Sequence, residues 1–493
     1  MKLANLATAA VFAAFLAAPI GSLASFGPDQ FAEKLVTAKQ LFAPQLLAAD
    51  DDYRNDVARR LVSNSPIGMD AISAKNTLDF KVFGFTNTPE VISGEAGWLF
   101  YKPGFENGKC LSDREIGFVL GRVEALRVIA RAIGIDYRVS VSPDKEVVYP
   151  EKLGPAAEAA AGCKILSSRK WRKVAEASGS SVIDHFKVMG HDVTDDLLYF
   201  KTDTHWNELG KIRAFRQLVG ELTGREIPGE IISNATSKYE TDSTRNLLRV
   251  HFEEEKKLYN DYIDKNLPAE SLNRIPKAVI IHDSFYGVSR DLISRIFLNP
   301  TLLTYGAPDL DRKIRDILAT KPQLVLANTV ERYLKQRVWG DLAWTGAVGK
   351  AFIDSNAEAA RGCPVHDIGK DRLTLKSLDE TPSGDFAAGV DPQIHVRLPD
   401  DGRPCIRVLF GTALKQPTFV HLPIRDAVNQ NGPYFEGFSL TLADSPGQRD
   451  IWVILPEEFA GTTLRIDPIA SNGLLSKLKV QTGSLPPISV TRQ

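Results

Sequence analysis

The sequence is poor in cysteine, has no excess of charge of either sign and contains only one long apolar run. Its 493 residues include 4 cysteines, and none has the Cys-x-x-Cys or Cys/His spacing of a zinc site. We therefore expect neither a metal ion nor a cofactor. Lysine and arginine number 60 against 61 acidic residues, so no overall field attracts nucleic acid, and no nucleic-acid partner is expected. The basic cluster Arg169, Lys170, Arg172 and Lys173 is interpreted as a solvated helix face.

The apolar run lies at the N-terminus, where Lys2 precedes residues 6–20 and the small residues Ser22 and Ala24 follow. A basic start, a short apolar stretch and small residues before the cleavage point are typical of a secretory signal. We predict that residues 1–24 are a signal peptide and that the protein is exported to the periplasm. An uncleaved membrane anchor is the alternative, although the run is short for a full span.

Export to an oxidising compartment suggests that the four cysteines form two disulfides. Three connectivities are possible. Pairing within each half of the chain is the most economical, and it joins Cys110 to Cys163 and Cys363 to Cys405.

Strand and helix patterns alternate in the first two thirds of the chain. Apolar residues recur at helical spacing over 113–132. A short strand follows at 137–141, and a helix at 170–177 precedes a second strand at 181–184. This order predicts an α/β domain with a parallel sheet flanked by helices, which we assign to residues 25–348. In such sheets, functional sites lie at the carboxyl ends of the strands.

Asp203 and His205 stand two residues apart, just before a predicted helix. In an extended segment, residues i and i+2 point to the same side, so the carboxylate can orient the imidazole and stabilise its cation. This is the arrangement of the general base and its orienting group in a catalytic triad. A helix cap beside a hydrogen-bonded histidine, or a pair of metal ligands, would explain the same spacing.

A candidate nucleophile follows the continuous apolar run at 276–281, which is expected for a strand buried on both faces. Ser284 stands at the turn between this strand and a helix predicted at 291–297. Such a turn presents a serine at the edge of the sheet, next to amide donors for an oxyanion. A lone serine here would be a helix N-cap, but with Asp203 and His205 it completes a Ser-His-Asp set.

Asn328 is a further candidate site residue, because it follows a strand predicted at 324–326. Its side-chain amide could donate to an oxyanion or cap a helix. Glu331 and Arg332, which come next, are interpreted as a structural ion pair.

Short apolar runs separated by turns follow residue 349. The strand candidates are 394–398, 405–410, 418–422, 439–442, 451–455 and 463–466. Their spacing predicts a β-sandwich at 349–493, and such a domain attached to an exported enzyme often binds carbohydrate. Trp452 and Tyr434 are candidates for stacking on sugar rings, although packing in the core is the commoner role of such residues.

A serine after a buried strand, with Asp-x-His in a loop, resembles the SGNH hydrolase superfamily, but here the Asp-x-His block comes first. This permuted order is similar to the alginate O-acetyltransferase family of the AlgX/AlgJ type, over roughly residues 85–335, and the C-terminal sandwich favours the AlgX-like branch. His282 departs from the pattern, because a glycine often stands two positions before the serine. The blocks that carry the resemblance are Gly97-Trp98-Leu99-Phe100, Pro143-Asp144-Lys145 with Tyr149-Pro150, Thr202-Asp203-Thr204-His205-Trp206-Asn207, Asp283-Ser284-Phe285 and Val330-Glu331-Arg332.

The resemblance implies a periplasmic enzyme that O-acetylates an exported polysaccharide, alginate or a similar exopolysaccharide. Ser284 would carry the acetyl group, His205 would act as the base and Asp203 would orient it. The Ser284 amide and Asn328 would hold the oxyanion. The acetyl group would come from a membrane-bound acyltransferase, and other components of a polysaccharide secretion complex are further expected partners.

Two other functions fit the same residues. An SGNH-type carbohydrate esterase or deacetylase would use the same triad, since the two reactions differ only in whether a sugar hydroxyl or water attacks the acyl-serine. A non-catalytic glycan-binding scaffold of a secretion complex would not require all three triad residues.

Overall fold

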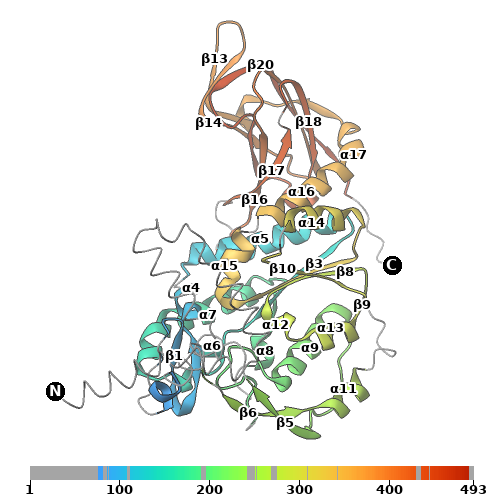
Figure 1. Ribbon diagram of the computed structural model, residues 1–493. Helices are drawn as coiled ribbons and strands as arrows, with labels where there is room; N and C mark the ends of the chain where they lie inside the picture. Colours follow the sequence, from blue (N-terminus) through green and yellow to red (C-terminus); the bar gives the residue numbers. More distant parts are fainter. Residues whose placement is uncertain are drawn as a thin grey trace, which may run out of the picture. The chain divides into compact units, whose positions relative to one another are not determined.

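The computed structural model (Figure 1) describes residues 76–81, 86, 88–107, 111–189, 196–240, 250, 252–267, 275–307, 309–340, 342–428, 435–443 and 445–487. They form two compact units. The first unit consists of the described residues up to Lys102, together with those in 200–204 and 238–255. The second unit consists of the described residues in 103–199, in 205–237 and from 256 onward. The signal peptide predicted at 1–24 lies outside the described residues. Within the described part of the chain, no helix combines the length and the apolar character needed to cross a membrane.

A five-stranded parallel sheet forms the centre of the α/β part of the second unit. Every residue of its strands β8 and β11 is buried, as the apolar run at 276–281 predicted for a strand covered on both faces. Val330 pairs with Ser142, and Ala327 pairs with Ile281. The sheet order is β10 (Thr301–Thr304), β8 (Ala278–His282), β11 (Leu324–Val330), β3 (Asp136–Ser142) and β4 (Ile183–Asp184).

Helices cover both faces of this sheet: α5, α14 and α16 lie on one side and α9, α12 and α13 on the other (Figure 1). The predicted helix at 113–132 is confirmed as α5 (Asp113–Ala132), and a capping box between Ser112 and Glu115 begins it. The helix predicted at 170–177 is only the end of α7 (Pro155–Ala177), which begins earlier with a proline at its first turn. The other helices are α4 (Lys102–Asn107), α6 (Lys145–Val148), α8 (Phe186–Met189), α9 (Glu208–Thr223), α11 (Asn260–Asn266), α12 (Ser284–Gly287), α13 (Arg290–Ile296), α14 (Leu310–Ala319), α15 (Leu334–Gly340), α16 (Leu342–Ser355) and α17 (Ala357–Arg361).

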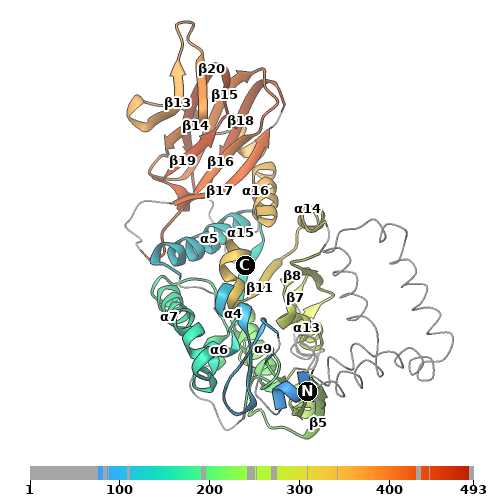
Figure 2. The same cartoon turned by 60° about the vertical axis from the view of Figure 1, so that its left-hand side comes forward.

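The C-terminal part of the second unit consists of antiparallel strands (Figure 2). Side chains alternate along them: Ile394 and Val396 of β14, like Ile406 and Val408 of β15, are buried in the apolar core. Each of the six predicted strands falls on one of β14 to β19, whereas β12, β13 and β20 were not predicted. The strand order is β17 (Phe435–Ala443), β16 (Thr418–Ile424), β19 (Thr463–Asp467), β14 (Phe386–Arg397), β20 (Gly473–Leu485), β15 (Arg403–Thr412) and β18 (Gly447–Ile454), with β12 (Val365–Asp367) on β20 and β13 (Leu373–Glu380) on β14.

The expected fold class is therefore confirmed: an α/β region with a parallel sheet is followed by a region of antiparallel strands. The domain boundary predicted at residue 348 falls inside α16, and the first strand of the C-terminal region begins at Val365.

One predicted disulfide is present: Cys363 and Cys405 are bonded, with their Cα atoms 6.5 Å apart. It joins the segment after α17 to β15. Cys163 is also disulfide-bonded, whereas Cys110, its predicted partner, lies outside the described residues.

The first unit contains a small antiparallel pair, β1 (Val91–Ser93) and β2 (Leu99–Tyr101). The turn between them contains Gly97 at φ +81°, a conformation that glycine adopts without strain. Leu99 donates its main-chain N–H to the carbonyl of Lys201 at 2.9 Å, which ties this pair to the 200–204 segment. The remaining strands that the structure describes are short pairs: β5 (Ala235–Glu240) with β6 (Glu253–Leu258), and β7 (Ile275–Pro276) with β9 (Phe297–Leu298).

Candidate active site

Acidic residues stand at the carboxyl ends of four strands of the parallel sheet. Asp184 is the last residue of β4, Asp283 and Glu331 directly follow β8 and β11, and Asp144 follows β3 after one proline. Because the strands are parallel, these ends lie at the same edge of the sheet. This edge is where the sequence predicted a site.

Ser284 begins the short helix α12 immediately after β8 and Asp283, and it is exposed. Asp283 caps this helix, because its Oδ1 accepts the main-chain N–H of Phe285 at 2.9 Å. Its Oδ2 accepts the main-chain N–H of Val330 at the end of β11 and an N–H of Arg337 at 2.8 Å. The turn that presents Ser284 is therefore tied to the neighbouring strand.

His205 lies in the loop before α9, beside this turn. Its imidazole centroid is 5.0 Å from the ring of Phe285, the residue after Ser284. Trp206 is fully buried, with its ring 5.1 Å from the ring of Phe285, and Asn207 caps α9. The structure thus brings His205 to the segment that carries Ser284.

Asp203 belongs to the first compact unit. It is buried, and the hydroxyl of Tyr239 donates to its Oδ2 at 3.3 Å. The neighbouring Thr202 donates its main-chain N–H to Oε1 of Glu254 at 2.7 Å. The Asp-x-His block therefore crosses from one unit to the other, and its carboxylate is shielded from water within the first.

A buried ion cluster surrounds Asp144 at the same edge of the sheet. Lys164 of α7 donates to Asp144 at 2.6 Å, to the carbonyl of Gly104 at 2.9 Å and to Glu146. Arg332 donates to the second oxygen of Asp144. Burial raises the pKa of the Asp144 carboxyl, but the charges of Lys164 and Arg332 outweigh it and hold the pKa below its ordinary value. Burial raises the pKa of Glu146 above its ordinary value in spite of Lys164.

A second cluster joins Asp184 and Glu331. Arg172 donates to Asp184 at 2.9 Å and to Oε2 of Glu331 at 2.7 Å, and the indole N–H of Trp171 donates to Oε1 of Glu331 at 2.8 Å. Two predictions need correction here. Arg172 faces the interior rather than solvent, and Glu331 and Arg332 pair with other residues instead of with each other.

Residues 91–249 match the family model described as "SGNH hydrolase-like domain, acetyltransferase AlgX". This confirms the resemblance to the alginate O-acetyltransferase family. The match contains Asp203 and His205, and Ser284 lies beyond it. No curated protein matches the chain.

Several solved structures are similar to this chain. Pseudomonas aeruginosa AlgX is 15% identical, with 81% of this chain and 96% of that chain covered and a TM-score of 0.36. The O-acetyltransferase domain of Pseudomonas putida AlgJ is 16% identical, with 50% and 93% covered and a TM-score of 0.33. In the C-terminal region, the CBM6 of LamC from Zobellia galactanivorans is 12% identical, with 24% and 100% covered and a TM-score of 0.18.

A polar chain that the sequence did not reveal runs inside the α/β part of the second unit. Tyr286, two residues after Ser284, is buried, and its hydroxyl lies 3.0 Å from Nε2 of His185 and accepts from Ser140 at 3.1 Å. The other ring nitrogen of His185 lies 3.0 Å from the amide oxygen of Gln217. Burial lowers the pKa of His185 to about 4, so the ring is neutral at pH 7.

Asn328 is placed differently from the prediction. Strand β11 runs to Val330, four residues beyond the predicted end, so Asn328 lies within the sheet and is fully buried. Its amide nitrogen donates to the hydroxyls of Ser140 and Ser142, each at 3.1 Å. Both N–H groups of the amide are therefore used inside the sheet, and the assignment of Asn328 as an oxyanion donor is not supported by this geometry.

Of the two residues predicted to stack on sugar rings, the structure describes only Trp452. Trp452 on β18 is half-buried, and the guanidinium of Arg407 lies 4.9 Å from its ring centroid. One side of Trp452 packs against the buried group around the Cys363–Cys405 disulfide, so it has both a packed and an accessible part. Tyr434 lies outside the described residues.

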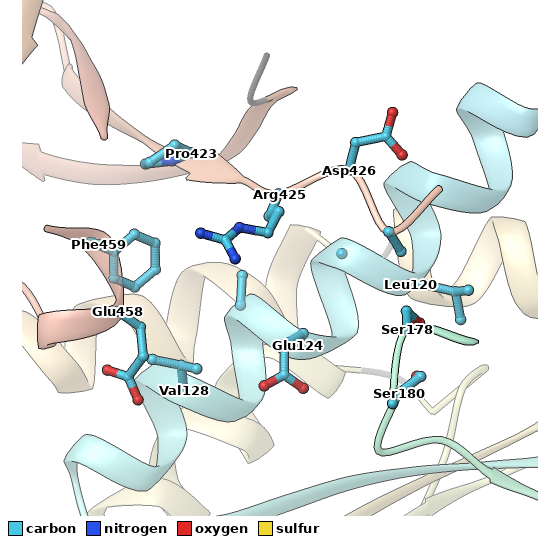
Figure 3. Close-up of a pocket in the computed structure, with 14 residues that line it drawn as sticks. Leu120, Glu124, Val128, Ser178, Ser180, Pro423, Arg425, Asp426, Glu458 and Phe459 are labelled. Carbon is cyan, nitrogen blue, oxygen red and sulfur yellow. The ribbon is translucent and has the colours of Figure 1, made fainter. Parts of the chain in front are cut away.

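A cleft of about 400 Å³ lies within the second unit between α5 and the segment after β16 (Figure 3). Figure 3 shows Arg425 reaching toward α5, with Glu124 and Phe459 close by. At Gly121 of α5 the approach is so close that a Cβ atom would lie 2.1 Å from the carbonyl oxygen of Arg425. None of the predicted catalytic residues lines this cleft.

Proposed function

We propose that this protein is a serine O-acetyltransferase that moves an acetyl group onto hydroxyls of an exported polysaccharide. The observation that carries the proposal is the exposed Ser284 at the turn after β8, with the His205 ring 5.0 Å from the ring of the adjacent Phe285. The match of residues 91–249 to an acetyltransferase family supports the choice of reaction.

In the first half-reaction, the oxygen of Ser284 attacks the acetyl carbonyl of the donor while His205 takes the serine proton. The main-chain N–H of Ser284 stabilises the oxyanion. The donor's leaving group departs with the proton from His205 and leaves an acyl-serine ester.

In the second half-reaction, a sugar hydroxyl gives its proton to His205 and attacks this ester. The acetylated sugar leaves, and Ser284 regains its proton from His205. Asp203 orients the imidazole and stabilises its cation.

The partners in this proposal are those that the family resemblance implies. The acceptor is a polysaccharide such as alginate, and a membrane-bound acyltransferase supplies the acetyl group in the periplasm, which the predicted signal peptide allows the chain to reach. Trp452 provides a ring for stacking on the acceptor.

The test is an assay of the purified chain with a chromogenic acetyl ester and several oligosaccharide acceptors, in which mass spectrometry detects acetate added to the glycan. We expect Ser284→Ala to lower transfer by about 10³-fold or more, because the nucleophile is lost. Ser294→Ala, an exposed serine on α13, is the matched control and should retain activity.

Three results would contradict the proposal in different ways. Acetate release without transfer to any acceptor would identify an esterase. Glycan binding without either reaction would identify a scaffold. Full transfer by Ser284→Ala would exclude Ser284 as the nucleophile.

A further inference from the structure

Arg337 contacts the carboxylate that shapes the Ser284 turn, although sequence reasoning gave it no role. Asp283 immediately precedes Ser284, and its side chain is 4% exposed. Its Oδ1 is used by the cap on Phe285, so Oδ2 is left for Val330 and Arg337. Within the described part of the chain, Arg337 is the only cationic group that forms an ion pair with this carboxylate.

The guanidinium of Arg337 is itself held in place. It lies 4.3 Å from the ring centroid of Tyr305 and 4.6 Å from that of Tyr333. Cation–π contact with two rings restricts the side chain, so its N–H is aimed at Asp283 before any substrate arrives.

The position of Asp283 in the chain makes this contact relevant to Ser284. The same carboxylate caps the helix that begins with Ser284 and accepts from the end of the neighbouring strand. A rotation of the Asp283 side chain would break its hydrogen bond with the main-chain N–H of Phe285. The ring of Phe285 is also the one against which His205 packs. A change at Asp283 would therefore alter the placement of both Ser284 and His205.

We infer that Arg337 is a positioning residue for the nucleophile: by holding the Asp283 carboxylate, it keeps the Ser284 turn in the reactive geometry. This inference rests on the proposed function, because it requires Ser284 to be the nucleophile. Arg337 acts through Asp283, so it should affect the rate of attack by Ser284 and leave the affinity for the acceptor unchanged.

The experiment measures the reactivity of Ser284 by itself, independently of acetyl donor and acceptor. A sulfonyl fluoride reacts with the serine: an O–S bond forms, the S–F bond breaks, His205 takes the proton and fluoride leaves. Intact-protein mass spectrometry gives the labelling rate as a function of reagent concentration, and so separates the maximal rate from reagent affinity.

We expect Arg337→Met to lower the maximal labelling rate by about 10- to 100-fold with reagent affinity unchanged, as for a small misplacement of a reacting group. Arg337→Lys should restore part of the rate, because it keeps the charge. Lys335→Met is the matched control, since it removes a cation from the same helix but one paired with Glu115. It should label within about twofold of the unmodified chain, as expected for a half-exposed ion pair.

A double-mutant cycle with Asp283→Asn separates positioning from general destabilisation. If Arg337 acts through Asp283, Arg337→Met should change the rate by less than about threefold in the Asp283→Asn background. If Arg337→Met does not fold, Arg337→Lys is used in the same cycle. Equal losses in both backgrounds, or wild-type labelling of Arg337→Met, would overturn this inference alone. Failure of the unmodified chain to label at Ser284 would instead overturn the proposed function.

Discussion

The carboxyl edge of the parallel sheet and the C-terminal antiparallel region differ in the burial and the partners of their charged side chains. At the sheet edge, the buried Lys164 forms ion pairs with the buried Asp144 and Glu146. In the C-terminal region, pairs such as Arg397–Asp400 are on the surface, with side chains 53% and 71% exposed. Arg449 is buried there too, but main-chain carbonyls of Gln416 and Ser445 accept its N–H groups.

This difference shows where the fold accepts an energetic cost. A buried charge loses its hydration, and only close partners offset that loss. In the C-terminal region, the alternating residues of the core are apolar, and the buried Arg449 has main-chain carbonyls as its partners. The sheet edge accepts this cost around Asp144, where Lys164 and Arg332 are the close partners of the buried carboxylate.

The largest effect on stability should come from Lys164→Met, because it leaves Asp144 and Glu146 buried without their shared cation. We expect a loss of about 3–5 kcal/mol in the free energy of unfolding. Arg397→Gln, the matched change at an exposed pair, should cost about 1 kcal/mol or less. Chemical denaturation followed by tryptophan fluorescence measures both values, and similar losses for the two variants would remove the contrast between the regions.

The second prediction concerns pH and compares a buried with an exposed histidine. The pKa of His185 is lowered to about 4 by burial, whereas the unfolded chain has a histidine pKa near 6.5. Between these values the unfolded state binds the additional proton, so the stabilising contribution is complete above about pH 6.5 and is lost as pH falls toward 4.

His185 should therefore contribute up to ~3 kcal/mol to the loss of stability across this window. His185→Gln should flatten the dependence of unfolding free energy on pH, and His366→Gln, at an exposed site on β12, should leave it unchanged. Parallel pH curves for the unmodified chain and His185→Gln would contradict the buried, neutral state of this ring.

The smallest effect is expected where α5 closely approaches Arg425 of the C-terminal region. A methyl group at Gly121 would lie 2.1 Å from a main-chain oxygen, which is difficult to move. Gly121→Ala should cost about 1–3 kcal/mol. Gly162→Ala in α7, where a Cβ atom meets nothing within 4 Å, should stabilise the chain by up to about 1 kcal/mol. Thermal unfolding of the two variants tests this, and a neutral Gly121→Ala would show that the C-terminal segment can move away from α5.

Several parts of the fold were predictable because they depend on local pattern. The helical period over 113–132, the apolar run before Ser284 and the alternating strands of the C-terminal region all appear in the structure. The Asn328 prediction depended on where β11 ends. The strand extends through Val330 because it pairs with β3 along its whole length, and such pairing cannot be read from the residues of one strand.

By itself, the sequence determined the helix at 113–132, the six strands predicted between residues 394 and 466, the turn that presents Ser284 and the Asp-x-His spacing, because these depend on residues that are neighbours in the chain. The tertiary structure decided which cations pair with each carboxylate: Asp144 pairs with Lys164, 20 residues away, and with Arg332, 188 residues away. It likewise brought Arg337 to Asp283 across 54 residues. Pairing over such separations depends on sheet register and helix packing, because a buried charge takes whichever partner the folded backbone places within reach.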